Sequence, residues 1–466
     1  MRTYRGKRVY PLTAAQKLHF FTLRHCPKKQ VLNIGTSLTI EQELDQEVLK
    51  EAIRQAYGRC DAMRLRFVEG KDGVVYQYVA DKEERKIELA DFSGWSEEEV
   101  TKRLREWTEI PFERFDSPMN RLVIIRMPDG FEGMYLLVDH MTMDAQALIA
   151  FLKDVIEIYC HIKYEGIDYP KPMAPYIPQL KKDLEYEAGN SAQKRDAAFF
   201  RQLIEESEPI FCDLEGTRRL ERERKRMQDP GYRAAVCAVG SVDAGIETFH
   251  LEEEPSRQLM EFCETYRVPM VCLLLMGLRT YLQKENGFDD VSVNTTVARR
   301  ATLAEKKCGG TRIHCFPFRT VISKDSSFLD GIRMIQQGQN RIFRHANYNS
   351  VHYYEERGSY YGLKPEQTYE PMSLTYQPMT LKNNGLDKLG DIRYKSAWYS
   401  NGAAAQNLYL TVMHRAADNG LDFNFEYQTG AVTKKKLEYV YYYLCRILFK
   451  GVENPECSVG ELIAGV

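Results

Sequence analysis

The sequence lacks the features that mark several large classes of protein. It has no apolar run of about 18 residues, the length that a membrane-spanning helix needs. The formal net charge is only −2, which gives no indication of a nucleic-acid or anionic-membrane partner. The segment from Met1 to Pro11 is basic and has no apolar centre, so we expect no secretory signal peptide.

Cysteine is present, but not in a spacing that suggests a disulfide framework or a metal site. The eleven cysteines are an odd number, and no two of them form a C-x-x-C pair. This usage is typical of reduced thiols, and we predict no bound metal. Together with the missing signal peptide and membrane helix, it predicts a cytoplasmic protein.

What is present is an ordinary globular composition and one unusual stretch. The 466 residues are enough for two or three domains, each with its own core. The apolar run from Met134 to Val138 predicts a buried strand, and it ends in Asp139 and His140. Asp144 follows where a helix N-cap is expected, before apolar residues at helical spacing. The pattern therefore places a titratable histidine between a strand and a helix.

This stretch resembles a signature of the condensation domains of nonribosomal peptide synthetases, which are related to chloramphenicol acetyltransferase. The signature is His-His-x-x-x-Asp-Gly, and the chain has Asp139-His-Met-Thr-Met-Asp144-Ala145. His140 and Asp144 match the second histidine and the aspartate. Asp139 stands at the place of the first histidine, and Ala145 at the place of the glycine.

Further segments resemble motifs of the same family, in the same order along the chain. They are Tyr10–Gln16, Gly58–Phe67, Gly310–Arg319 and Phe423–Tyr427. The second has Cys60 and Asp61 where the family has histidine and glutamate, and the third has His314 where asparagine is usual. We expect the arginines of Gly58–Phe67 to form structural ion pairs. The resemblance covers nearly the whole chain.

Hydrophobic periodicity predicts alternating strands and helices. Strands are expected at 34–41, 74–79, 122–127, 134–138, 249–251, 291–297, 372–377, 408–414 and 421–427. Helices are expected at 45–57, 96–107, 256–266, 268–284, 328–343 and 434–449. The charged run Arg218–Arg226 predicts a solvated helix or loop, with a docking patch for an acidic carrier protein as the alternative.

The resemblance implies an α/β fold of two chloramphenicol-acetyltransferase-like subdomains. Each has a mixed sheet flanked by helices, and the two form a V-shaped pseudo-dimer with the active site at their interface. The proline-rich segment Lys171–Pro178 is the expected boundary. It gives an N-terminal half at 1–178, which carries the Asp139–Ala145 motif, and a C-terminal half at 179–466.

The resemblance also implies the roles of individual residues. His140 is the expected catalytic residue, and a neutral imidazole can take a proton from a nucleophile near neutral pH. Asp144 is expected to be structural and to pair with Arg300. Asp139 would favour the imidazolium form of His140 if the two side chains interact. His314 either faces the tunnel between the halves or hydrogen-bonds locally.

The expected function is that of a free-standing condensation enzyme. It would transfer an acyl group from a carrier-protein thioester to an amine or a hydroxyl, giving an amide or an ester. It would bind no cofactor of its own, because its substrates arrive on the phosphopantetheine of acyl or peptidyl carrier proteins. Two alternatives stay open. Asp139-x-x-x-x-Asp144 also fits heterocyclisation domains, and the substituted signature also fits a non-catalytic adaptor that binds carrier proteins.

Overall fold

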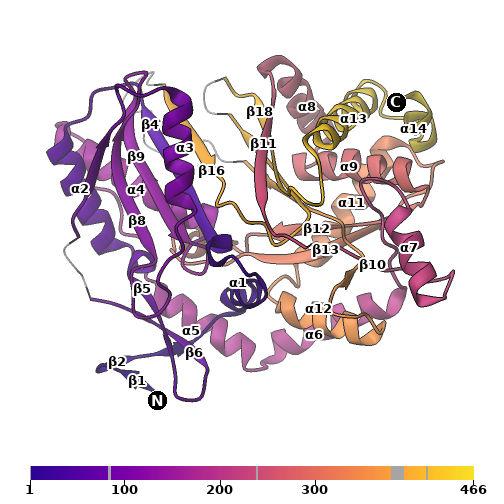
Figure 1. The fold of residues 1–466 in the computed structure, drawn as a ribbon, viewed down its shortest axis with the longest axis horizontal. Coiled ribbons are helices and arrows are strands. Elements are labelled where there is room, and N and C mark those ends of the chain that lie inside the picture. Colours follow the sequence, from indigo (N-terminus) through magenta and orange to yellow (C-terminus); the bar gives the residue numbers. More distant parts are fainter. Residues whose placement is uncertain (1, 82–84, 238–239, 379–392, 416–417) are drawn as a thin grey trace. The chain divides into compact units, whose positions relative to one another are not determined.

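The computed structural model describes residues 2–81, 85–237, 240–378, 393–415 and 418–466, and these divide between two units (Figure 1). The first unit takes the described residues up to 190, together with 298–313 and 393–403. The second takes the described residues of 191–297, 314–378 and 404–466. Two later segments of the chain thus belong to the first unit. The boundary expected at residue 178 lies inside α5 (Tyr176–Glu187).

The first unit is built on a five-stranded sheet in the order β16-β4-β9-β8-β7. β7 runs parallel to β8, and the other neighbours are antiparallel, so the sheet is mixed. The strands are β16 (Tyr394–Tyr399), β4 (Asn33–Ile40), β9 (Glu132–Asp139), β8 (Asn120–Arg126) and β7 (Glu88–Asp91). β16 was not predicted, and it pairs with β4 from more than 350 positions further along the chain.

Helices cover both faces of this sheet. Alternate residues of a strand point to opposite faces, so each strand can contact one helix on either side. On one face, Leu104 of α3 (Glu97–Thr108) packs with Val123 of β8 and Tyr135 of β9. On the other face, the hydroxyl of Tyr57 donates to the side chain of Asn120 at 3.1 Å. Tyr57 belongs to α2 (Gln46–Arg59), which packs against α4 (Ala145–Lys163). Every residue of β9 is buried as a result.

A smaller sheet and two further helices complete the part of the first unit that matters for the site. The sheet has the order β3-β6-β5, with β3 (Tyr10–Pro11), β6 (Val75–Val79) and β5 (Leu65–Glu69). α1 (Ala14–His25) begins at Thr13, whose side chain accepts from the N–H of Gln16. Thr13 is therefore the N-cap of α1. α10 (Leu303–Lys306) lies in the 298–313 segment.

The second unit is built on a six-stranded sheet in the order β11-β18-β17-β15-β12-β13. β15 runs parallel to both β12 and β17, and the other neighbours are antiparallel. The strands are β11 (Ala244–Leu251), β18 (Leu421–Gln428), β17 (Leu408–His414), β15 (Ser373–Gln377), β12 (Asp290–Val297) and β13 (His314–Val321). Two mixed sheets with flanking helices confirm the predicted α/β class.

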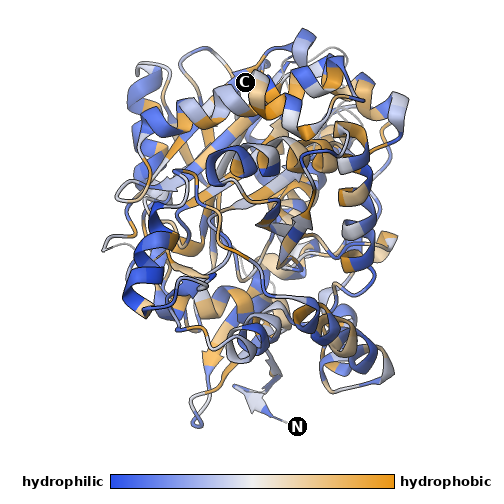
Figure 2. Cartoon of the chain, turned by 90° about the vertical axis from the view of Figure 1, so that its right-hand side faces the viewer, coloured by the Kyte–Doolittle hydropathy of each residue, from blue (hydrophilic) through white to orange (hydrophobic). Residues whose placement is uncertain are grey.

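The helices of the second unit are amphipathic, apart from one that is buried almost all round. They are α6 (Ser191–Glu206), α7 (Arg218–Met227), α8 (Glu253–Tyr266), α9 (Met270–Asn286), α11 (Phe328–Phe343), α12 (Ser350–Tyr360), α13 (Lys434–Glu453) and α14 (Val459–Gly465). α9 packs against both α11 and α13, so most of its residues are buried. Hydrophilic and hydrophobic residues mix along the helices in Figure 2, as amphipathic helices require.

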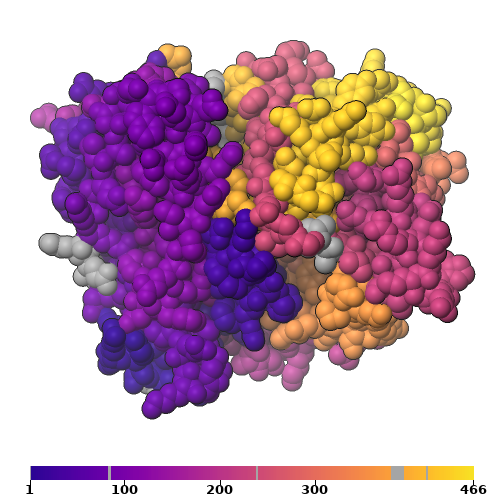
Figure 3. Space-filling model, viewed as in Figure 1, coloured from indigo at the N-terminus to yellow at the C-terminus, as the bar shows by residue number. Residues whose placement is uncertain are grey.

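The charged run of the sequence is helix α7, as one of the two expectations had it. Arg218, Arg222 and Lys225 are exposed, and this part of the chain lies at the surface in Figure 3. Other residues of the run are anchored locally: Arg226 pairs with Glu223 at 2.7 Å. The run thus forms a helix with exposed charges, and its use as a docking patch stays a prediction.

None of the eleven cysteines is joined to another in a disulfide bond. Burial raises the pKa of the Cys60 thiol to about 12, so this residue of the Gly58–Phe67 segment is inert near neutral pH. Across the described residues, no helix has the length and apolar content needed to cross a bilayer.

A buried ion pair in the second unit makes stability depend on pH. Nη1 and Nη2 of Arg357 each donate to the carboxylate of Glu370 at 2.7 Å, and the hydroxyl of Ser292 donates to it at 2.8 Å. Burial alone would raise the pKa of Glu370, but the charge and hydrogen bonds of Arg357 outweigh burial and hold this pKa below its usual value. Ionised Glu370 therefore stabilises the fold above the unfolded-state pKa of about 4.3.

We expect the stability difference between the wild type and Glu370→Gln to shrink as the pH falls. The contribution of Glu370 is complete above about pH 4.3 and disappears as the pH passes through the lower folded-state pKa. Urea unfolding at a series of pH values measures this difference. Glu254→Gln is the control, because Glu254 is exposed where it pairs with Arg257 and should change stability little at any pH. An equal difference at neutral and acidic pH would contradict the expectation.

Candidate functional site

The candidate site lies in the first unit, where β9 ends and α4 begins. β9 runs through the buried centre of its sheet, and His140 is the residue after its last one. The N–H of His140 donates to the carbonyl of Leu32 at 2.8 Å, which ties the turn to the residue before β4. The side chain of His140 is partly exposed, and its Nδ1 atom is buried. The turn thus fixes the backbone while leaving part of the ring open.

The surroundings of His140 keep its imidazole neutral. Burial lowers the pKa of His140, and this effect outweighs the charges of Asp144 and Asp139, which favour the imidazolium. The ordinary value is about 6.5, so a lowered pKa leaves the ring neutral at pH 7. A neutral imidazole can accept a proton from a nucleophile. The electrostatics of the site therefore suit a general base.

The carboxylate of Asp139 pairs with Arg114, a residue that the sequence analysis did not identify. The guanidinium of Arg114 donates to Oδ2 of Asp139 at 2.6 Å, and the N–H of Met141 donates to Oδ1 at 2.9 Å. Burial raises the pKa of Asp139, and the charge of Arg114 opposes that rise. Among the described residues, no hydrogen bond joins the side chain of Asp139 to that of His140. Asp139 therefore acts on His140 only through its charge, which Arg114 offsets.

Asp144 forms the ion pair with Arg300 that the resemblance implied. Nη2 of Arg300 lies 2.8 Å from Oδ1 and 2.9 Å from Oδ2, and both side chains are almost fully buried. Asp144 also accepts from the N–H of Ala147, as the predicted N-cap of α4, and from the N–H of Arg312. One carboxylate thus joins the start of α4 to the 298–313 segment.

Arg300 holds the backbone of its own segment in place as well. It donates to the carbonyls of Glu305, Cys308 and Gly310 at 2.6–2.7 Å. A guanidinium has five N–H donors in a fixed plane, so a lysine could not replace these contacts. The ion pair between Asp144 and Arg300 therefore anchors the 298–313 segment to the turn between β9 and α4, which carries His140.

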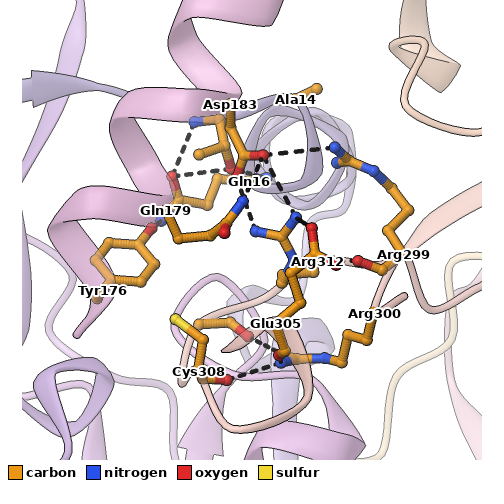
Figure 4. Close-up of polar contacts among 12 residues, drawn as sticks. Ala14, Gln16, Tyr176, Gln179, Asp183, Arg299, Arg300, Glu305, Cys308 and Arg312 are labelled. Carbon is orange, nitrogen blue, oxygen red and sulfur yellow. Dashed lines mark hydrogen bonds and ion pairs between the residues drawn. The ribbon is translucent and has the colours of Figure 1, made fainter. Parts of the chain in front are cut away.

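A second group of charges fastens the same segment to α5. Asp183 lies 2.9 Å from Arg312 and 3.6 Å from Arg299, and Arg312 also lies 3.4 Å from Glu305 (Figure 4). In Figure 4, Arg299 and Arg312 both point toward Asp183, which belongs to α5. Arg299 adopts a φ of 51°, in the left-handed region, immediately before Arg300. These contacts explain why 298–313 belongs to the first unit.

Ala145 fits its position without a glycine. It is the first residue of α4, and it is not among the residues with positive φ. The alanine therefore causes no strain in the turn between His140 and α4. The departure from the family signature at this position is structurally neutral.

His314 lies in the second unit and is bonded locally. It begins β13 and is fully buried, and its Nδ1 donates to the carbonyl of Tyr348 at 2.7 Å. This is the local hydrogen bond that formed one of the two expectations for His314.

Arg59 and Arg64 of the Gly58–Phe67 segment form the expected structural ion pairs. Arg59 lies 3.0 Å from Asp154 of α4, and Arg64 lies 2.7 Å from Asp61. Both guanidiniums also donate to backbone carbonyls. They stabilise the end of α2 and the start of β5.

His19 is a residue of this site that the sequence analysis did not single out. It lies on α1, three positions after Gln16, and its ring stacks on the ring of His140 with centroids 4.0 Å apart. The chain has only nine histidines, and the segment that opens α1 resembles the opening motif of the family. The sequence could have indicated His19 as a histidine on the buried side of that helix, but only the fold shows that its ring contacts His140.

The described residues contain no group of three or more histidine, cysteine, aspartate or glutamate side chains that could hold a metal ion.

Comparison with protein families gives one match that spans nearly the whole chain. The family model described as the condensation domain matches residues 6–463. Among curated proteins, surfactin synthase subunit 1 of Bacillus subtilis (strain 168) is 23% identical over 471 residues, which are 97% of this chain and 12% of that protein. The dimodular nonribosomal peptide synthase of the same organism is 25% identical over 466 residues, 97% of this chain and 18% of that protein. The chain thus spans less than a fifth of these relatives.

Solved structures show the same fold over the whole domain. The first condensation domain of the calcium-dependent antibiotic synthetase, in complex with substrate analogue 2a, is similar with a TM-score of 0.79 and 17% identity. The match covers 97% of this chain and 99% of that one. The starter condensation domain of rhizomide synthetase, in complex with C8-CoA, also has a TM-score of 0.79 at 17% identity, with 97% of this chain and 96% of that one covered.

Proposed function

The chain belongs to the condensation-domain family, and from that premise we propose that it transfers an acyl group from a thioester to an amine or a hydroxyl in peptide biosynthesis. The observation that carries the proposal is His140, a neutral imidazole at the end of a buried strand, in a turn that Asp144 and Arg300 hold. In the reaction the nucleophile attacks the thioester carbonyl, a C–N or C–O bond forms and the C–S bond breaks. His140 takes the proton of the nucleophile and returns it to the leaving thiolate.

We propose that the donor is carried on a phosphopantetheine thiol of an acyl or peptidyl carrier protein. The similar starter domain of rhizomide synthetase binds C8-CoA, which supports a donor of the pantetheine class. The acceptor arrives as a second nucleophilic substrate. An α-amine with a pKa near 7.7–8.0 is already roughly a tenth neutral at pH 7, so an amine depends less on a base than a hydroxyl does.

The test is incubation of the protein with acyl-loaded carrier proteins and a panel of amines and alcohols, with mass spectrometry of the released product. The panel includes cysteine and serine acceptors, because a heterocyclising enzyme would give a product one water lighter than the linear amide. An amide or ester that forms only when the protein is present supports the proposal. Carrier protein binding without turnover of any acceptor would instead support the adaptor, and would contradict the proposed function.

A further inference from the structure

Two histidines meet face to face at the candidate site. The ring centroids of His19 and His140 lie 4.0 Å apart, and the ring planes differ by 25°. His19 is only 7% exposed, so its ring is enclosed by protein rather than by solvent. This contact joins α1 to the turn after β9, and both elements belong to the first unit.

The stack is held in place from two directions. Nε2 of His19 lies 3.2 Å from the hydroxyl of Thr311, which is buried as well. Also from α1, the side-chain amide of Gln16 donates to the carbonyl of Met141 at 3.3 Å and to the side chain of Gln77 at 2.8 Å. Since Met141 follows His140, α1 and the turn cannot separate without breaking these bonds.

Thr311 is itself fixed by the ion pair of the site. The carbonyl of Gly310, before it, accepts from Arg300 at 2.7 Å. The N–H of Arg312, after it, donates to Asp144 at 2.9 Å. The pair of Asp144 and Arg300 is therefore linked to His140 in two ways, along the turn between β9 and α4 and through Thr311 and the ring of His19.

The charged groups around the two rings leave little to stabilise a second positive charge. Asp139 and Asp144 face His140 from its own strand and turn, but Arg114 and Arg300 pair with them. The 298–313 segment, which contacts His19 through Thr311, also carries Arg299 and Arg312, and both of these pair with Asp183. Two imidazolium rings in contact within this weakly solvated site would repel each other strongly.

We propose that His19 is a positioning residue for His140, and that the stacked pair carries only one proton during the reaction, on His140. The role in catalysis rests on the proposed function. When His140 takes the proton of the nucleophile, neutral His19 offers its π face to the new imidazolium, which is a favourable arrangement for a cation. The two rings therefore titrate as a pair, and each proton step belongs to both.

The titration of His140, followed by NMR of the histidine ring, tests the pair directly. The His140 signal is assigned by its absence in His140→Ala. We expect two steps in the wild type, separated by more than about one pH unit, as coupled groups show. His19→Phe and His19→Gln, which cannot be protonated, should each leave a single step. His25→Phe is the control, because His25 is exposed on the same helix and its ring lies against that of Phe21, tilted by 38°. A His140 curve unchanged by both His19 variants would overturn the proposal.

Measurements of kcat and KM distinguish a positioning role of His19 from a purely structural one. His19→Ala should lower kcat by up to about 100-fold with little change in KM, because the His140 ring loses its orientation. His19→Phe should recover most of this loss, because phenylalanine keeps a flat ring against His140. Equal kcat values for His19→Ala and the wild type would refute the positioning role. If the wild type turns over no acceptor, the proposed function fails, while the titration still decides whether the rings are coupled.

Discussion

Replacement of His140 by alanine is expected to lower the rate of acyl transfer by about 10²- to 10⁴-fold, the range that a general base contributes. The loss should be larger with an alcohol than with an amine. A hydroxyl must lose its proton as it attacks, whereas part of an amine is already neutral at pH 7. With an amine, the ring mainly orients the nucleophile and takes up the proton after the attack.

Single-turnover measurements with one acyl-loaded carrier protein and matched amine and alcohol acceptors give both rates. His25→Ala is the matched control, since His25 is an exposed histidine at the end of α1 whose Nδ1 lies 2.8 Å from the carbonyl of Phe21 on the same helix. It should react at the wild-type rate. Turnover by His140→Ala at the wild-type rate, with either acceptor, would remove His140 from the mechanism.

With an alcohol acceptor, which does not titrate near neutral pH, the acid limb of kcat/KM is expected to lie below pH 6.5. The reaction needs neutral His140, and burial lowers the pKa of His140 from 6.5, so activity should persist into more acidic solution than a free imidazole would allow. The profile of kcat/KM reports groups of the free enzyme. It is measured between about pH 5 and 8, the range in which histidine titrates. A midpoint above 6.5 would show that the charges of Asp139 and Asp144 outweigh burial.

The sequence predicted local structure best where periodicity and end signals agree. α11 and β17 begin and end at the predicted residues, because each is a strongly patterned segment with clear flanks. Asp144 was predicted as an N-cap, and its carboxylate does accept from the N–H of Ala147. Such features depend on neighbours along the chain, so single-sequence reasoning reaches them.

What the sequence could not give are the contacts made by distant segments. β16 is a six-residue edge strand whose partner, β4, lies far away in the chain. α5 begins inside a proline-rich stretch that suggested a boundary rather than a helix. The sequence around Arg114 and around His19 does not indicate their roles. Only the folded chain brings Arg114 to Asp139 and His19 to His140. The pair of Asp144 and Arg300 was found through the family resemblance, not through spacing.

Replacement of Arg300 by methionine is expected to reduce the free energy of unfolding by about 3–5 kcal/mol, because it leaves the carboxylate of Asp144 buried without its partner. The side chains of Arg300 and Asp144 are 1% and 2% exposed, so water cannot replace the lost contacts. The double variant with Asp144→Asn should be destabilised by less than the sum of the two single variants, since it leaves no uncompensated charge. Urea unfolding measures all three. The control is Arg54→Met, whose guanidinium is 53% exposed and lies 3.5 Å from Glu51, and which should cost less than about 1 kcal/mol. Equal losses for Arg300→Met and Arg54→Met would show that the buried pair does not hold the 298–313 segment in place.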